Sequence, residues 1–117
     1  MNTLVNRVQL VGRLGANPEI IQLEGDKRLA KFSLAVNERY LTKNGERKER
    51  TEWFNLIAWD KKAELVERLL IKGAKVAVGG SLSTNKWKDK EGNERSNLQI
   101  SLNDFTLLVK PEETSTK

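Results

Sequence analysis

The stretch "RTEWFNLIAW", Arg50 to Trp59, decides the fold class because it predicts a β-strand that is apolar on both faces. Side chains of a strand alternate between two faces. The face expected to point into a core carries three apolar residues: Phe54, Leu56 and Ala58. The opposite face carries Trp53 and Trp59, although a half-buried strand usually presents polar residues there. The second apolar face therefore requires a role outside the core.

Composition limits the chemistry that the chain can perform. Its 117 residues suffice for one domain with one core. It has 21 Lys+Arg against 16 Asp+Glu, and the resulting formal charge of +5 favours polyanionic partners. The absence of Cys and His excludes disulfides, thiolate or imidazole metal ligands, and Ser-His or Cys-His nucleophiles. Carboxylates are interspersed with Lys and Arg, and no P-loop pattern occurs. We therefore predict a protein that is not an enzyme and holds no metal or cofactor.

Two alternating segments precede the opening stretch. Residues 6–14, "NRVQLVGRL", predict a first strand that ends near the turn-forming "GANP". Residues 29–36, "LAKFSLAV", predict a second strand. The Asn44-Gly45 pair is a strong hairpin signal, so the second strand and the opening stretch should be antiparallel neighbours.

After Trp59 the period of the apolar residues changes to that of a helix of about three turns. We expect Asp60 to serve as its N-cap and Gly73 to follow its C-terminal end. Alternation then returns in "AKVAVGGSL", where Gly79 and Gly80 predict a bulge or bend. A long hairpin with its turn at residues 91–93 leads into a fifth strand that runs to about Leu108.

This order predicts an all-β fold with one helix, namely a five-stranded oligonucleotide/oligosaccharide-binding (OB) barrel with the helix between strands 3 and 4. An open five-stranded sheet covered by the helix is the alternative. The barrel domain should span residues 1–109, and residues 110–117 should form a short disordered tail. The first ten residues lack a signal-peptide pattern and no apolar run approaches about 18 residues, so we expect a cytoplasmic protein.

Outward-facing aromatic rings on a basic surface are suited to stacking against unpaired bases. Trp53 and Trp59 are such candidates, and Trp87 lies between Lys86 and Lys88 in a polar hairpin. A tryptophan in a strand is, however, more often part of a core or subunit interface. Tyr40 shares the parity of the core-facing residues of its strand, so a twist or bulge would be needed to expose it with the tryptophans.

Cations cluster in both predicted hairpins. The first hairpin carries five of them: Arg39, Lys43, Arg47, Lys48 and Arg50. The second carries Lys86, Lys88, Lys90 and Arg95, which its three carboxylates nearly cancel. Phosphate neutralisation would make binding salt-dependent. The first hairpin is therefore the better candidate for phosphate contacts.

Taken together, "NRVQLVGRLGANPE", "RTEWFNLIAW", "LLIKGAKVAVGGSL" and "NKWKDKEGN" make the chain resemble bacterial single-stranded DNA-binding proteins over Asn6–Leu108. The resemblance implies single-stranded DNA binding without strong sequence preference, in replication, recombination and repair, by a homotetramer associated with the nucleoid. It implies base stacking at four positions: Tyr40, Trp53, Trp59 and Trp87. It also implies DNA contacts from four lysines: Lys43, Lys61, Lys72 and Lys86.

The chain departs from the family where it ends, at "PEETSTK". Family members commonly continue into a flexible linker and an acidic tip that recruits other proteins, so we expect no recruitment through such a tip here. One alternative is a tail-less primosomal-type OB protein that acts mainly as a protein-interaction adaptor. Another is an OB module for structured RNA or another ligand. The full set of four aromatic residues favours single-stranded DNA over the adaptor.

Overall fold

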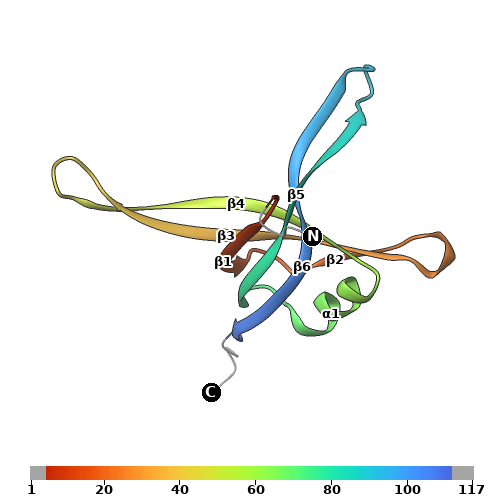
Figure 1. The fold of residues 1–117 in the computed structure, drawn as a ribbon, viewed down its shortest axis with the longest axis horizontal. Helices are drawn as coiled ribbons and strands as arrows, with labels where there is room; N and C mark the ends of the chain where they lie inside the picture. The colour runs from red at the N-terminus through yellow and green to blue at the C-terminus, as the bar shows by residue number, and fades with distance from the viewer. Residues whose placement is uncertain (1–4, 112–117) are drawn as a thin grey trace.

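The computed structural model describes residues 5–111, which form six β-strands, one α-helix and one short 3₁₀ helix (Figure 1). Residues 1–4 of the predicted domain and residues 112–117 of the predicted tail therefore lie outside the described part of the chain. The elements, in chain order, are β1 (Val8–Leu14), β2 (Glu19–Gln22), η1 (Glu24–Asp26), β3 (Arg28–Leu41), β4 (Arg47–Trp59), α1 (Lys61–Leu69), β5 (Lys75–Lys88) and β6 (Glu94–Val109).

Five of the strands close into a barrel. The strands are hydrogen-bonded in the order β1-β5-β6-β4-β3-β2, and an additional β1–β3 pairing closes the ring. All neighbouring pairs are antiparallel except β4 and β6, which pair in parallel at Leu56↔Ile100 and Ile57↔Ser101. The open-sheet alternative is therefore wrong, because β1 is hydrogen-bonded to strands at both of its edges.

The prediction of exactly five strands with the helix after the third needs correction. The short strand β2 was not predicted, because its "EIIQ" sequence carries two adjacent isoleucines instead of an alternating pattern. It pairs with β3 outside the closed ring. Helix α1 consequently follows the fourth strand in chain order, although only three strands of the ring precede it.

Helix α1 is shorter than predicted and packs against β3, β4 and β6. It ends at Leu69 because Leu70 adopts an extended conformation, so Gly73 (φ +89°) lies in the following turn instead of capping the helix. Asp60 occupies the N-cap position without capping through its side chain. Its carboxylate instead accepts a hydrogen bond from the Arg28 backbone N–H at 3.4 Å, which ties the start of the helix to the start of β3.

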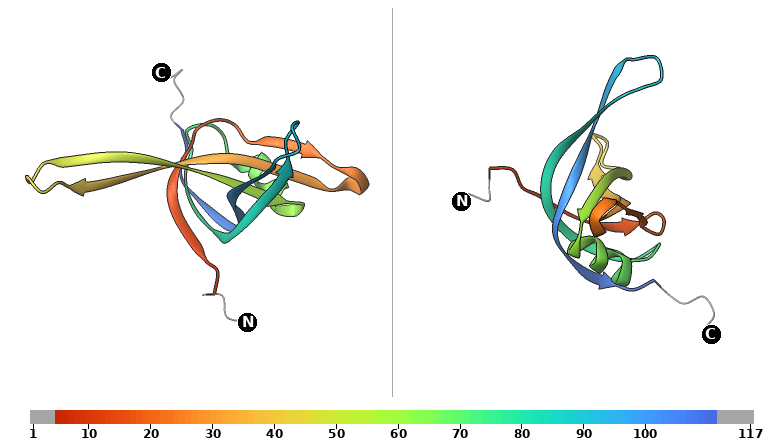
Figure 2. Two further views of the ribbon diagram at one scale, coloured as in Figure 1. Left: turned by 90° about the horizontal axis from the view of Figure 1, so that it is seen from above. Right: turned by 90° about the vertical axis from the view of Figure 1, so that its right-hand side faces the viewer.

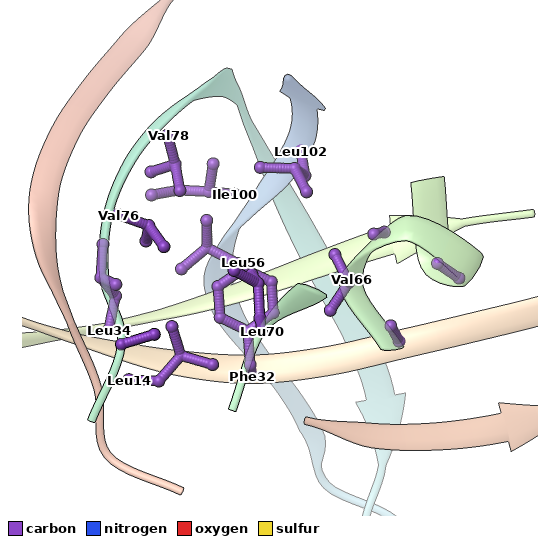
Figure 3. Close-up of a cluster of buried hydrophobic side chains, with 14 residues drawn as sticks. Leu14, Phe32, Leu34, Leu56, Val66, Leu70, Val76, Val78, Ile100 and Leu102 are labelled. Atoms are coloured by element: carbon purple, nitrogen blue, oxygen red, sulfur yellow. The ribbon is translucent and has the colours of Figure 1, made fainter. Parts of the chain in front are cut away.

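The barrel core is apolar and is closed on one side by α1 (Figure 3). Phe32 and Leu56 contribute from β3 and β4, and Val66 points into the same cluster from the helix. Two glycines permit close strand crossings, because a Cβ on Gly12 would collide with the Ala35 carbonyl oxygen and one on Gly80 with that of Ser101. The predicted irregularity at Gly79–Gly80 is confirmed by a register shift between these residues in the β5–β6 pairing.

Two hairpins extend well beyond the barrel in different directions (Figures 1 and 2). We call residues 37–51 of the β3–β4 hairpin the first arm, and residues 83–99 of the β5–β6 hairpin the second arm. The antiparallel pairing of β3 with β4 confirms the hairpin predicted from Asn44-Gly45. The pairing of β5 with β6 continues out to Lys88↔Glu94, which confirms the second hairpin. Within residues 5–111, no helix is long and apolar enough to cross a membrane.

Candidate nucleic-acid interface

Trp53 and Trp59 lie on the outer face of β4, as the alternation of its residues predicts. Trp53 is 59% exposed and Trp59 is 47% exposed, whereas Leu56 and Ala58 are buried in the core. Trp59 follows Trp53 by six residues, which at the usual rise per residue corresponds to about 20 Å along the strand. Ile57 is an exception on this face. The alternation predicts that it points outward with the tryptophans, but it is buried. The two rings are therefore separate exposed platforms on one strand.

The ring of Trp53 lies against the loop that connects β1 to β2. A Cβ added to Gly15 would stand 2.5 Å from Cζ3 of the indole, so any larger residue here would displace the ring from its present position. The Gly15 N–H also donates to the Ser33 carbonyl at 3.3 Å, which holds the loop beside β3. The loop thus supports one side of the Trp53 ring. Gly15 was not among the predicted site residues.

A polar cleft of about 360 Å³ includes Asn55, which stands two residues from Trp53 on β4, and residues from five strands and the β1–β2 loop line it. We call it the amide cleft because most of its polar side chains are amides: Asn17, Asn55, Asn85, Asn97 and Gln99. It combines the outer face of β3 and β4 with the base of the second arm. None of these residues was predicted, although Asn55 and Asn85 each stand two positions from a tryptophan on the same strand face.

Trp87 projects from the second arm and is 45% exposed. It pairs with Arg95, and the next pair on the same face towards the barrel is Asn85↔Asn97. The face of the arm that carries Trp87 therefore continues into the amide cleft. Lys86 and Lys88, which flank Trp87 in the sequence, point to the other face of the arm.

Tyr40 is 46% exposed because the first arm carries it beyond the barrel. Consecutive residues of β3 and β4 pair without interruption from Leu29↔Trp59 to Leu41↔Arg47, so Tyr40 keeps the parity of the core-facing residues. Of the two ways considered to turn Tyr40 towards the tryptophans, a bulge is therefore absent from this stretch, whereas the uninterrupted register is compatible with a twist of the arm. The guanidinium carbon of Arg50 lies 5.9 Å from the centre of the Tyr40 ring, within the range of a cation–π contact.

The predicted cations are distributed around the molecule instead of forming one cluster. Lys43, Arg47 and Lys48 lie at or near the tip of the first arm. Lys61 opens α1, two residues after Trp59, and Lys72 lies in the turn before β5, where its backbone N–H donates to Asn17 Oδ1 at 2.8 Å. Two arginines of the first arm are paired with carboxylates: Arg39 with Glu49 at 3.5 Å, and Arg50 with Glu38 at 3.4 Å.

The turn of the second arm is organised by one carboxylate. Asp89 Oδ1 accepts hydrogen bonds from the backbone N–H groups of Glu91 and Asn93, and its Oδ2 accepts one from Arg95 Nε at 3.0 Å. The Arg95 guanidinium and these N–H groups lower the pKa of the Asp89 carboxyl below its ordinary value. Within residues 5–111, no three or more His, Cys, Asp or Glu side chains are grouped so as to hold a metal ion.

Comparison with known proteins identifies related sequences and structures. The sequence model of the "Single-strand binding protein family" matches residues 5–108. A single-stranded DNA-binding protein of Rhizobium meliloti (strain 1021) is 37% identical over 103 residues, which are 86% of this chain and 59% of that protein. One from Neisseria meningitidis serogroup A is 36% identical over 111 residues, covering 95% of this chain and 64% of the relative. The chain thus spans about three fifths of the length of these curated relatives.

A solved structure described as a complex of Plasmodium falciparum SSB with ssDNA has the same fold. It superposes with a TM-score of 0.83 at 34% sequence identity, and the match covers 93% of this chain and all of that chain.

Proposed function

The chain belongs to the single-strand binding protein family, and on this premise we propose that it binds single-stranded DNA without strong sequence preference. Its barrel is of the OB type, with β2 added outside the five-stranded ring. The bound strand would be kept from re-pairing during replication, recombination and repair. This is binding without catalysis, and it requires no cofactor.

The observation that carries the proposal is the pair of exposed tryptophans on the outer face of β4, next to the amide cleft. Exposed indole rings cost solvation free energy unless a ligand or a partner covers them. Bases stack on such rings whatever their identity, which makes the recognition tolerant of sequence. Trp87 and Tyr40 extend this set onto the two arms, so the proposed stacking residues are Tyr40, Trp53, Trp59 and Trp87.

The phosphates of the strand would be neutralised by lysines and arginines along its path. We assign this role to eight residues: Lys43, Arg47, Lys48, Arg50, Lys61, Lys72, Lys86 and Lys88. Arg50 is the least available of them, because it already pairs with Glu38 and lies over Tyr40. The DNA ligand places the protein at the nucleoid in the cytoplasm, and microscopy of a fluorescently tagged chain would test this location.

We also propose that the chain assembles as a homotetramer. Val11 points away from the core on β1 and is exposed, and an exposed valine on a regular strand suits a subunit contact. Sedimentation equilibrium would measure the assembly directly. A monomer across the concentration range would contradict the proposal.

The experiment that tests DNA binding is a titration of tryptophan fluorescence with oligo-dT and, separately, with duplex DNA of the same length. Stacking of bases on the exposed indoles should quench the emission with oligo-dT far more strongly than with the duplex. The affinity should fall as the salt concentration rises, because phosphate contacts release counterions. An unchanged emission with oligo-dT would contradict the proposal and favour the protein-interaction adaptor.

A further inference from the structure

We propose that the amide cleft is a binding site for the hydrogen-bonding edges of the bases that stack on Trp53 and Trp87. Asn55, Asn85 and Asn97 would donate to and accept from these edges, and Gln99 also lines the cleft. This inference rests on the function proposed above. It assigns to the cleft a chemical role different from stacking and from phosphate neutralisation.

Two of the cleft amides are spaced so that each can reach the edge of a base stacked on a neighbouring tryptophan. Asn55 stands two residues from Trp53 on β4, and Asn85 stands two residues from Trp87 on β5. Residues two apart share a face of a strand and lie about 7 Å apart along it. A base stacked on either ring therefore has its edge close to an amide of the same strand. Asn97, the partner of Asn85 across the second arm, adds a third amide on that face.

The side chains of these cleft amides are not used by the fold. Within residues 5–111, the side-chain hydrogen bonds of the protein involve none of Asn55, Asn85, Asn97 and Gln99. Other amides hold the structure together instead. Asn6 bridges to the backbone of Leu82, Asn17 accepts from the Lys72 N–H, and Asn37 accepts from the Thr51 hydroxyl.

The charges that line the cleft offset each other. Its charged side chains are Glu19 and Lys31, which are cross-strand partners of opposite sign. A cleft without net charge is poorly suited to binding phosphate. The cations of the two arms, which are suited to phosphate, lie farther from the barrel. Each amide carries both a donor and an acceptor, so rotation of the side chain lets it match adenine, thymine, cytosine or guanine edges. The cleft can therefore strengthen binding to bases without selecting a sequence.

The test compares oligo-dT with an oligonucleotide of equal length in which every thymine is replaced by 2,4-difluorotoluene. This isostere keeps the size and the stacking face of thymine but replaces its carbonyl and N–H groups with C–F and C–H groups. Affinities are measured by competition against a fluorescently labelled strand. The native chain should bind the isostere more weakly, by about fivefold for each hydrogen bond removed.

The matched variants show whether the cleft amides cause this difference. In N55A/N85A/N97A the ratio of the two affinities should fall towards one, because the amides that sense the edges are gone. N103A removes an exposed amide of β6 outside the cleft and should keep the native ratio. Any intrinsic difference between the two oligonucleotides cancels when the ratios are compared.

The possible results separate this inference from the proposed function. Equal affinities of the native chain for the two oligonucleotides, with strong quenching by both, would overturn the inference and leave the stacking function intact. A native-like ratio in N55A/N85A/N97A would also overturn it. A failure of both oligonucleotides to bind or quench would overturn both proposals.

Discussion

The two arms have the same construction but differ in what they present to a ligand. Each ends in a turn with the same backbone hydrogen bonds: Thr42 N–H to Glu46 and Gly45 N–H to Thr42 in the first arm, and Asp89 N–H to Asn93 and Gly92 N–H to Asp89 in the second. The aromatic residue of the second arm shares a face with the amide cleft, whereas that of the first arm keeps the parity of the core.

The charges of the two arms differ as well. The first arm carries five cations against three carboxylates. Two of its arginines form ion pairs with glutamates of the opposite strand, and its two lysines, Lys43 and Lys48, lie closer to the tip than these pairs. The second arm carries four cations against three carboxylates that alternate with them around the turn. From this comparison we expect the second arm to contribute mainly to base contacts and the first mainly to electrostatic attraction.

The largest expected effect comes from the aromatic residues of the arms. Trp87→Ala should weaken the binding of oligo-dT by about 1–3 kcal/mol, the range found for base stacking in single-stranded DNA-binding OB folds, or about 5- to 150-fold. Tyr40→Ala should cost less than Trp87→Ala, because Arg50 already lies over one face of the tyrosine ring and Tyr40 is not among the residues that line the cleft. Competition binding against a labelled strand measures both affinities.

The matched comparison is between these two single variants, because both remove one exposed ring from an arm. Circular dichroism should show the same β-sheet content in each, since neither ring belongs to the core cluster. A loss of affinity in Tyr40→Ala as large as that in Trp87→Ala would contradict the division of roles between the arms.

Most of the fold follows from local sequence signals. The alternation in β4 placed Trp53 and Trp59 outside and Leu56 inside, and Gly79-Gly80 marked the bend in β5. The errors arise where tertiary contacts override a local pattern. The apolar stripe predicted a longer helix, but Leu70 leaves it to enter the core with extended backbone.

The site was only partly predictable for a physical reason. Exposure of a ring on one strand depends on the alternation of that strand and can be read from the sequence. The amide cleft depends on the parallel pairing of β4 with β6, which brings Asn55 near residues 85–99 and has no local signal. The close approach of Gly15 to the Trp53 ring depends on the packing of Trp53 against a loop that lies 38 positions earlier in the chain, and this packing has no local signal either.

A smaller effect is expected in the salt dependence of binding. The double variant Lys43→Gln/Lys48→Gln should flatten the plot of log affinity against log salt concentration by about 1.4, or 0.7 for each phosphate of a single strand that is no longer neutralised. The pair Lys88→Gln/Lys90→Gln changes the net charge equally but should flatten the plot by only about half as much, because of these two lysines only Lys88 is assigned to a phosphate. Neighbouring carboxylates, Asp89 and Glu91, already offset the field of those lysines.

Titrations of each double variant with oligo-dT at several salt concentrations provide the slopes. Equal flattening of the plot in the two double variants would show that both arms track the phosphate backbone to the same extent. The predicted electrostatic difference between the arms would then be contradicted. The predicted difference in stacking would be unaffected, because it is measured with the aromatic variants.

The smallest expected effect concerns acid, and it distinguishes the two turns. In the first arm the hydroxyl oxygen of Thr42, which does not titrate, accepts from the Glu46 N–H at 3.1 Å. In the second arm the Asp89 carboxylate accepts from the Asn93 N–H at 2.9 Å, and the nearby Arg95 lowers the pKa of this carboxyl. A carboxyl whose pKa is lower in the folded than in the unfolded chain stabilises the fold above the unfolded value, which is about 3.9 for aspartate. That stabilisation disappears as the pH falls through the lower, folded value.

Lowering the pH from 5 to 2 should therefore reduce the hydrogen-exchange protection of the Asn93 amide while leaving that of the Glu46 amide largely unchanged. Carbon-13 NMR of the Asp89 carboxyl should show its titration below about 3.9. In Asp89→Asn the side-chain oxygen can still accept from the Asn93 N–H, so the acid-dependent decrease in protection should disappear. A parallel decrease in protection at Glu46 in the native chain would instead indicate that acid loosens both arms through the barrel.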